Sequence, residues 1–290
     1  MNRSIKVLIS LIFIAICAIL LWFVLGPRPS EKENEMEEAV SLPGVLVQSL
    51  ITGNGSIDST TQSILEELYQ NMVFVEGGSF MMGCEDSQAL DNEKPLHQVT
   101  LSSFYIGKYE VTQQQWEAVM GNNPSYFKGE HLPVEYVSWE DVEEFILHLN
   151  ALTGKQYRLP TEAEWEFAAR GGNQSKGYLY SGSNDLGSAA WYLKNSRSRS
   201  QSIGTKLPNE LGLFDMSGNV WEWCNDWYQS YYYIDSPEDN PQGAKSGNGR
   251  VLRGGAWGSY ADYIRLSVRY TSSPDSKGNS IGFRLVFSEN

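Results

Sequence analysis

Residues that could form a metal centre or act as nucleophiles are scarce in this chain. The histidines are three in number: His97, His131 and His148. No two of them lie at the spacing of a helical metal-binding pair, so we expect no histidine-based zinc or iron centre. Of the three cysteines, Cys17 lies within an apolar run, which leaves at most one pair, Cys84 and Cys224. A disulfide in an oxidising compartment and two free thiols both fit the sequence, because geometry decides whether a bridge forms.

Three glutamates, Glu162, Glu164 and Glu166, carry carboxylates at a spacing that resembles an acid–base pair. They directly follow Thr161, which has the position of a helix N-cap, and Glu164 completes a capping box with it. Carboxylates are stabilised near the positive end of a helix dipole, so a capped helix start explains the pattern without catalysis. We therefore assign no catalytic residue.

The segment of residues 257–263 combines aromatic, hydroxyl and carboxylate side chains. Its candidate ligand-binding residues are Trp257, Ser259, Tyr260, Asp262 and Tyr263. Tyrosine and tryptophan supply rigid amphipathic anchors, and small polar residues supply adaptable hydrogen bonds, as in antibody paratopes. The sequence therefore predicts a binding surface here, and an ordinary polar loop is the alternative. Elsewhere in the chain, Arg197 and Arg199 form a small basic patch that is interpreted as a solvated loop.

Capped helices and short strands are predicted to position these segments. The helices are expected over residues 113–120, from Ser138 to Gly154, and from Thr161 to Gly171. Strands are expected on both sides of a Gly-Gly turn within residues 73–82, and over residues 98–106, 221–224, 251–257, 264–270 and 282–287. The pattern predicts an α+β fold, rich in loops, with short antiparallel strands.

The N-terminus carries the signal of a membrane anchor. Residues 7–25 form an apolar run, interrupted by a single Ser10, that follows Arg3 and Lys6. A run of about 20 apolar residues can cross a bilayer, and this one is longer than the core of a typical signal peptide. We predict a single-pass transmembrane helix in residues 1–25, with the main domain outside the cytoplasm, in the periplasm or at the cell surface. Lipid attachment at Cys17 is the alternative.

The rest of the chain divides into a linker and one domain. Residues 26–71 are charged and punctuated by proline, with a short helix predicted over residues 63–71, and the main domain is expected over residues 72–290. The chain has a net charge of −13, which makes nucleic acid an improbable partner because an acidic surface repels phosphates.

Five blocks of sequence, in order, carry a resemblance to a known family. They are residues 74–83, residues 109–116, residues 157–170, residues 212–223, and residues 250–257 together with Gly282-Phe-Arg284. In these blocks the chain resembles the formylglycine-generating enzyme family, also called the sulfatase-modifying-factor domain, over about residues 72–287. The resemblance implies a variant of the C-type lectin fold.

The same resemblance exposes a missing pair of residues. The family's enzymes oxidise a substrate cysteine to formylglycine and resemble copper oxidases that hold the metal on two cysteines, which suits Cu(I) as a soft ion. Here Ser259 stands at the first of these positions, and Ile264, or a nearby gap, at the second. We therefore expect no copper and no formylglycine chemistry by that route.

A structural Ca²⁺ ion is the metal that the resemblance does predict. Calcium takes six to eight oxygen ligands. Asp215 and Glu222 offer carboxylates, and Gly218 and Val220 offer backbone carbonyls, at positions that match a calcium site of the family. The alternative is that this block is simply a turn flanked by core tryptophans.

These observations predict a membrane-anchored extracytoplasmic domain of this family that acts in binding or envelope assembly. Its partner would be a protein or another extracytoplasmic ligand, and residues 7–25 would contact the membrane. Two alternatives stay open: an oxidoreductase or protein-modifying enzyme with an unrecognised site, and a lectin-like receptor protein diversified by a retroelement.

Overall fold

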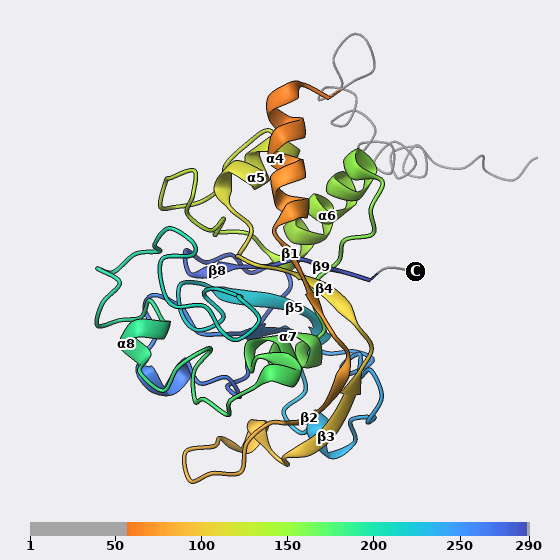
Figure 1. Cartoon of the computed structure of the whole chain (residues 1–290), viewed down its shortest axis with the longest axis vertical. Coiled ribbons are helices and arrows are strands. Elements are labelled where there is room, and N and C mark those ends of the chain that lie inside the picture. The colour runs from red at the N-terminus through yellow and green to blue at the C-terminus, as the bar shows by residue number, and fades with distance from the viewer. Residues whose placement is uncertain (1–56, 289–290) are drawn as a thin grey trace, which may run out of the picture. The chain divides into compact units, whose positions relative to one another are not determined.

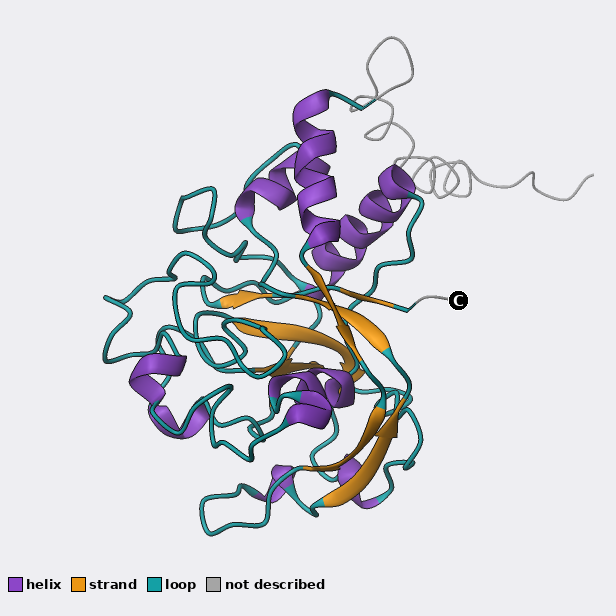
Figure 2. Cartoon of the chain, in the orientation of Figure 1, coloured by secondary structure: helices purple, strands orange, loops and turns teal. Residues whose placement is uncertain are grey.

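The computed structural model describes residues 57–288, which Figure 1 shows as a coloured ribbon. The helices of this part are α4 (Ser59–Gln70), α5 (Gln113–Met120), α6 (Trp139–Thr153), α7 (Glu162–Ala169) and α8 (Leu186–Ala189). The strands are β1 (Met72–Val75), β2 (Gly78–Met82), β3 (His97–Leu101), β4 (Phe104–Gly107), β5 (Trp221–Trp227), β6 (Arg250–Arg253), β7 (Tyr270–Ser272), β8 (Ile281–Gly282) and β9 (Val286–Phe287). Single 3-10 turns are η1 (Asp91–Glu93), η2 (Gly172–Gln174), η3 (Tyr232–Ile234) and η4 (Ala261–Tyr263). Figure 2 shows that loops connect most of these elements, as the loop-rich prediction requires.

The predicted anchor over residues 7–25 lies outside the described residues. Within residues 57–288, none of the helices has the length and apolarity needed to cross a membrane. The helix predicted over residues 63–71 is α4, which begins earlier because the Asp58 carboxylate accepts hydrogen bonds from two backbone N–H groups of its first turn. Leu65 of α4 is buried in the same hydrophobic cluster as side chains of α5 and α6, and Met72 packs against that cluster. The boundary predicted at residue 72 therefore falls between a helix and a strand that share one core.

Capping residues place the three predicted helices where they were expected. Thr112 and Ser138 form complete capping boxes at the starts of α5 and α6, and these helices end at Gly121 and Gly154 in the left-handed conformation. Thr161 caps α7 in the same way, through the backbone N–H of the third helical residue. These local signals are confirmed.

A four-stranded sheet in the order β7-β6-β5-β8 lies at the centre of the domain. Figure 1 shows β5 between α6 and α7. The remaining strands form the sheet β1-β4-β9 and the hairpin β2-β3. The prediction of antiparallel strands holds for every described strand pair except β5 and β8, which run parallel.

The central sheet buries both faces, because successive side chains of a strand point to opposite sides. Trp223 of β5 joins a cluster that includes Phe145 of α6. Its neighbour Cys224 joins a second cluster that includes Trp165 of α7. The two helices therefore cover opposite faces of one sheet.

Several predicted strands are shorter than expected. Residues 98–106 are divided into β3 and β4, and residues 282–287 into β8 and β9. The strand predicted over residues 251–257 ends at Arg253, because Gly254 and Gly255 follow with φ values of 90° and 78° that only glycine adopts readily.

The strand predicted over residues 264–270 is wrong, since only Tyr270 belongs to β7. The segment alternates apolar and polar residues, which usually marks one buried and one solvated face. Here Arg265 and Arg269 are only 3% and 2% exposed, like the apolar residues between them. The alternation reflects buried charge pairs.

Candidate functional site: an exposed aromatic surface and a buried ion-pair network

The predicted ligand-binding segment lies at the surface, but its five candidate residues play different parts. Tyr260 and Tyr263 are 67% and 45% exposed at η4, and Asp262 between them is exposed as well. Trp257 is half-buried, and its Nε1–H donates to the carbonyl of Asn279 at 2.9 Å. The Ser259 hydroxyl accepts the backbone N–H of Ala256 at 3.0 Å and so closes a turn. Two tyrosines and a carboxylate are thus free to contact a ligand, while Trp257 and Ser259 also fix the backbone.

Two aromatic residues that the sequence did not single out extend this segment. The rings of Phe127 and Trp257 meet edge to face with 5.6 Å between their centroids. Tyr126 packs against Phe127 at 5.0 Å and is itself 67% exposed. We refer to Tyr126, Phe127, Trp257, Tyr260 and Tyr263 as the aromatic surface. No local pattern in the sequence brings residue 127 beside residue 257, so only the fold reveals this contact.

The two positions that the resemblance assigned to copper ligands have different surroundings from each other here. Ser259 carries a hydroxyl that is engaged in the turn described above. Ile264 is fully buried in a small cluster with Leu186 and Ala190. Neither side chain offers a thiolate, which is the ligand that Cu(I) requires in this arrangement.

The predicted calcium loop is organised by charge pairs and hydrogen bonds. Both carboxylate oxygens of Glu222 lie 2.6 Å from the guanidinium of Arg284, and one also accepts the indole N–H of Trp165 at 2.7 Å. The backbone N–H of Val220 donates to the Glu110 carboxylate at 3.1 Å. The charge of Glu222 is therefore offset by Arg284, and its role as a calcium ligand stays a prediction.

Asp215 is the member of this loop that keeps an available ligand atom. Its Oδ2 accepts the backbone N–H of Gly204 at 2.7 Å, whereas its Oδ1 is buried without a partner. Burial raises the pKa of Asp215 to about 6 and that of Glu110 well above its usual value, and for Glu110 the nearby carboxylates raise it further. Residues 57–288 contain no group of three or more His, Cys, Asp or Glu side chains that is arranged to hold a metal ion. The calcium site stays a prediction, centred on Asp215.

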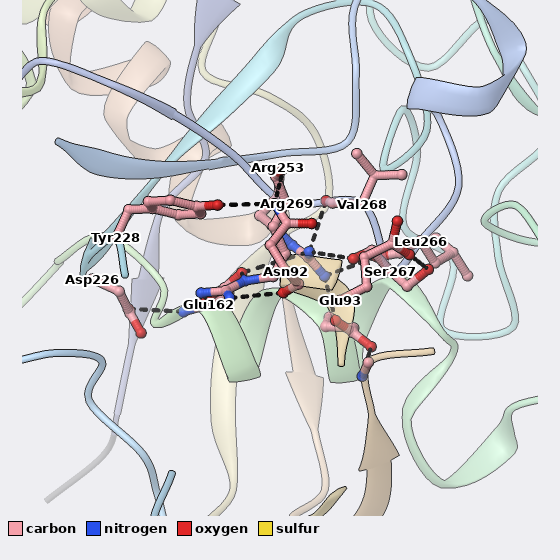
Figure 3. Close-up of polar contacts among 12 residues, drawn as sticks. Asn92, Glu93, Glu162, Asp226, Tyr228, Arg253, Leu266, Ser267, Val268 and Arg269 are labelled. Atoms are coloured by element: carbon pink, nitrogen blue, oxygen red, sulfur yellow. Dashed lines mark hydrogen bonds and ion pairs between the residues drawn. The ribbon is translucent and has the colours of Figure 1, made fainter. Parts of the chain in front are cut away.

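Next to this loop, around Trp165, buried arginines pair with glutamates of α7, and Figure 3 shows Arg269 beside Glu162. Arg253 forms an ion pair with Glu166 and donates to the backbone carbonyls of residues 266, 267 and 268. Arg269 binds both carboxylate oxygens of Glu162 at 2.6 and 2.8 Å. Arg265 binds Glu93 in the same two-pronged way, at 2.8 and 2.7 Å. These contacts, and not a ladder of strand pairs, fix the chain between residues 264 and 269.

The glutamates at the start of α7 therefore do more than complement a helix dipole. Glu162 and Glu166 are 1% and 0% exposed, so each carboxylate needs its arginine to offset the cost of desolvation. Burial raises the pKa of Glu162, but Arg269 and Arg253 lower it by more, so the group stays ionised. Sequence spacing identified the helix and missed these partners.

Asp226 and Cys224 lie on the same face of β5 without a cation of their own. Asp226 accepts the backbone N–H of Glu162 at 2.9 Å, and burial together with the Glu162 carboxylate raises its pKa to about 8. Burial also raises the pKa of the Cys224 thiol well above its usual value. Cys84 and Cys224 are both free, which is the second of the two alternatives left open by the sequence.

Comparison with known proteins supports the resemblance seen in the sequence blocks. Residues 59–289 match the family described as the sulfatase-modifying factor enzyme 1-like domain. The chaperone protein LppX of Paenibacillus barcinonensis is 34% identical over 84% of this chain and 99% of its own length. The formylglycine-generating enzyme of Streptomyces coelicolor is 38% identical over 75% of this chain and 89% of its own length. The serine/threonine-protein kinase pkn1 of Chlamydia caviae is 31% identical over 88% of this chain, which spans 44% of the kinase.

Solved structures agree with the fold. Treponema denticola variable protein 1 has 34% sequence identity and a TM-score of 0.70, over 75% of this chain and 95% of its own. PvdO from Pseudomonas aeruginosa has 29% identity and a TM-score of 0.66, over 75% of this chain and 94% of its own. The predicted fold of the formylglycine-generating enzyme type is confirmed. Because the family match covers most of the chain, this protein belongs to the sulfatase-modifying factor enzyme 1-like domain family.

Proposed function

We propose that this protein is a membrane-anchored domain that binds a partner protein outside the cytoplasm and does not generate formylglycine. The observation that carries the proposal is the exposure of Tyr260 and Tyr263, 67% and 45%, next to Ser259 and Ile264, the positions that the resemblance assigned to copper ligands. Ser259 and Ile264 replace the soft ligands there, so the surface keeps aromatic anchors without the metal ligands. Exposed aromatic side chains on a fixed backbone are typical of the residues that dominate protein interfaces.

The similar proteins support a binding role without deciding it. One relative that this chain spans almost completely is named a chaperone protein, and a chaperone must hold another polypeptide. The similarity to a variable protein of Treponema denticola suits a surface loop whose contacts differ between relatives. The similarity to a formylglycine-generating enzyme supports the alternative that this protein is an enzyme.

Site-specific photo-cross-linking tests the proposal directly. Benzoylphenylalanine is introduced at Tyr260 or Tyr263 of the full chain in its native cells, followed by irradiation. Both positions should give the same discrete adduct. Tyr231 provides a matched control, because it is 66% exposed and lies outside the aromatic surface. Absence of adducts at Tyr260 and Tyr263, or equal adducts at Tyr231, would contradict the proposal.

A second experiment separates binding from catalysis. The purified full chain is assayed for bound copper and for conversion of a cysteine-containing sulfatase peptide to its formylglycine form by mass spectrometry. We expect neither stoichiometric copper nor conversion. Copper-dependent turnover would favour the enzymatic alternative and overturn the proposal.

The anchor is tested separately from the surface. Protease added to intact spheroplasts should digest the domain, since residues 7–25 are proposed to hold it on the outer side of the membrane. Digestion that occurs only after lysis would place the domain in the cytoplasm.

A further inference from the structure

The loop of residues 194–199 carries three cationic side chains in a chain whose net charge is −13. Lys194, Arg197 and Arg199 are all exposed. None of them forms an ion pair with a carboxylate in the part of the chain that the structure describes. Their charges are therefore available to a ligand.

This cationic loop is attached to the aromatic surface. The Ser196 hydroxyl donates to the carbonyl of Trp257 at 2.8 Å, and the backbone N–H of Leu193 donates to the carbonyl of Ser259 at 3.1 Å. The guanidinium of Arg199 lies 5.5 Å from the centre of the Phe127 ring. The cationic loop is thus joined to the aromatic surface, with Arg199 in direct contact with it.

The backbone of the loop is held in a conformation that a solvated loop would not favour. Arg197 and Ser198 both have a φ of 58°, in the left-handed region that costs free energy for residues other than glycine. Ser196 is fully buried, and its carbonyl accepts the side-chain amide of Gln201 at 2.6 Å. Such conformations persist where surrounding contacts determine them, so the direction of the cationic loop is fixed by the fold. Arg197 and Arg199 are exposed, as predicted for a solvated loop, and the contacts of Ser196 fix the backbone that carries them.

We propose that this surface takes an acidic segment of the partner polypeptide, an inference that rests on the proposed function. Carboxylates of the segment would pair with Arg197, Arg199 and Lys194, and its apolar side chains would pack on Tyr260 and Trp257. Arginine pairs with carboxylates through two parallel hydrogen bonds, which gives direction as well as attraction.

The charge distribution favours a polypeptide segment over an anionic membrane. Exposed charges act over a screening length of about 8 Å at physiological ionic strength, so a narrow segment meets mainly the local cations. A flat anionic membrane would also face the acidic remainder of a chain with a net charge of −13. The cations therefore select an occupant that is small in cross-section and negatively charged.

Three labelled peptides and the full-length chain test the proposal by fluorescence anisotropy. The peptides share one short sequence with a central tryptophan and differ only in carrying glutamate, glutamine or lysine at the flanking positions. The glutamate peptide should bind about tenfold or more tightly than the glutamine peptide, and the lysine peptide should not bind. Added salt should weaken binding of the glutamate peptide.

Charge reversals assign the effect to the loop. The Arg197→Glu/Arg199→Glu double variant should weaken binding of the glutamate peptide about tenfold or more. Lys176→Glu/Lys245→Glu is the matched control, because these exposed lysines lie outside the loop and the change in net charge is the same. Arg197→Glu alone separates charge from packing, since Arg199 contacts Phe127 and Arg197 does not.

Each other outcome overturns the inference. The inference is wrong if the glutamate and glutamine peptides bind equally or if neither binds. It is also wrong if both double variants lose the same amount of binding. Loop-dependent binding to phosphatidylglycerol vesicles without binding of the glutamate peptide would assign the cations to a membrane. If cross-links from Tyr260 persist unchanged in the Arg197→Glu/Arg199→Glu variant, the proposed function stands and the acidic segment does not.

Discussion

The two faces of the central sheet are both buried, but they are stabilised differently. The face toward α6 presents Trp223 and Leu252, which pack among apolar side chains. The face toward α7 presents Glu222, Asp226 and Arg253, which are 0%, 2% and 0% exposed. One face gains stability by removing apolar area from water, and the other must neutralise each charge that it removes from water.

This difference determines how each face responds to substitution. A missing methyl group on the apolar face leaves a cavity, whose cost depends on its volume. Removing a charge from the other face leaves a buried partner group with one fewer opposite charge. The free-energy cost of that substitution depends on whether the partner group can change its protonation state. The predictions below use this distinction.

The largest effect is expected from Arg253→Met. The substitution removes one of the two arginine partners of Glu166 and three hydrogen bonds to backbone carbonyls, so unfolding should become easier by about 3–5 kcal/mol. Chemical denaturation measures this change. The control is Arg158→Met, because Arg158 pairs with Glu164 while its side chain is 40% exposed, and its loss should cost under about 1 kcal/mol. Equal costs would remove the distinction between buried and exposed pairs.

Leu252→Ala tests the opposite face at the neighbouring position. It should cost about 2–5 kcal/mol, because Leu252 is 1% exposed in a packed cluster. The cost should not change with pH, since no titratable group loses a partner. The cost of Arg253→Met should decrease in acid, because protonation can neutralise the carboxylates left behind. A parallel pH dependence of the two costs would show that the faces do not differ in the proposed way.

Calcium removal tests whether the charged face holds a further cation beside Arg284. If Asp215 binds Ca²⁺, the metal stabilises the folded state by about 2.7 kcal/mol when its concentration is a hundredfold above Kd. EDTA should then lower the melting temperature of the native chain but not that of Asp215→Ala. Glu222→Ala is a poorer probe, because it also leaves Arg284 unpaired. If EDTA leaves the melting temperature of the native chain unchanged, residues 212–223 form a turn without bound calcium.

Asp226→Asn is expected to change the pH dependence of stability. Burial raises the pKa of Asp226 to about 8 in the folded state, against its ordinary value of 3.8. The folded state therefore holds a proton that the unfolded state has released, so this stabilisation is complete below about pH 4 and is lost as the pH rises to about 8. The slope is at most about 1.4 kcal/mol per pH unit.

Asparagine cannot ionise and keeps an oxygen that can accept the N–H of Glu162. The free energy of unfolding of Asp226→Asn, measured between about pH 5 and pH 8, should therefore fall less steeply with pH than that of the native chain. Identical slopes in the two proteins would show that Asp226 is ionised in the folded state.

Short-range signals predicted the helices, because capping depends on residues three positions apart. Thr112, Ser138 and Thr161 each mark a helix start that the structure confirms. The buried ion pairs could not be predicted in this way, since Glu162 and Arg269 are 107 positions apart and only the fold brings them together.

The candidate site shows the same limit. Composition predicted that Tyr260 and Tyr263 would be exposed, whereas the contact of Phe127 with Trp257 depends on two distant loops. The cations of residues 194–199 were visible in the sequence. The sequence did not show that these cations are attached to the aromatic surface. That attachment depends on hydrogen bonds between residues some 60 positions apart, such as the one from the Ser196 hydroxyl to the carbonyl of Trp257.

Residues 260–263 are flanked on both sides by residues with buried contacts, and this affects how freely their sequence can vary. Before them, Arg253 binds the backbone carbonyls of residues 266–268, and after them Ile264 is fully buried. The exposed residues between these anchors contribute little to the core, so their identities can be exchanged while the scaffold keeps its shape. The segment is therefore suited to grafting: a library randomised at Tyr260, Asp262 and Tyr263 would explore new specificities on an unchanged frame.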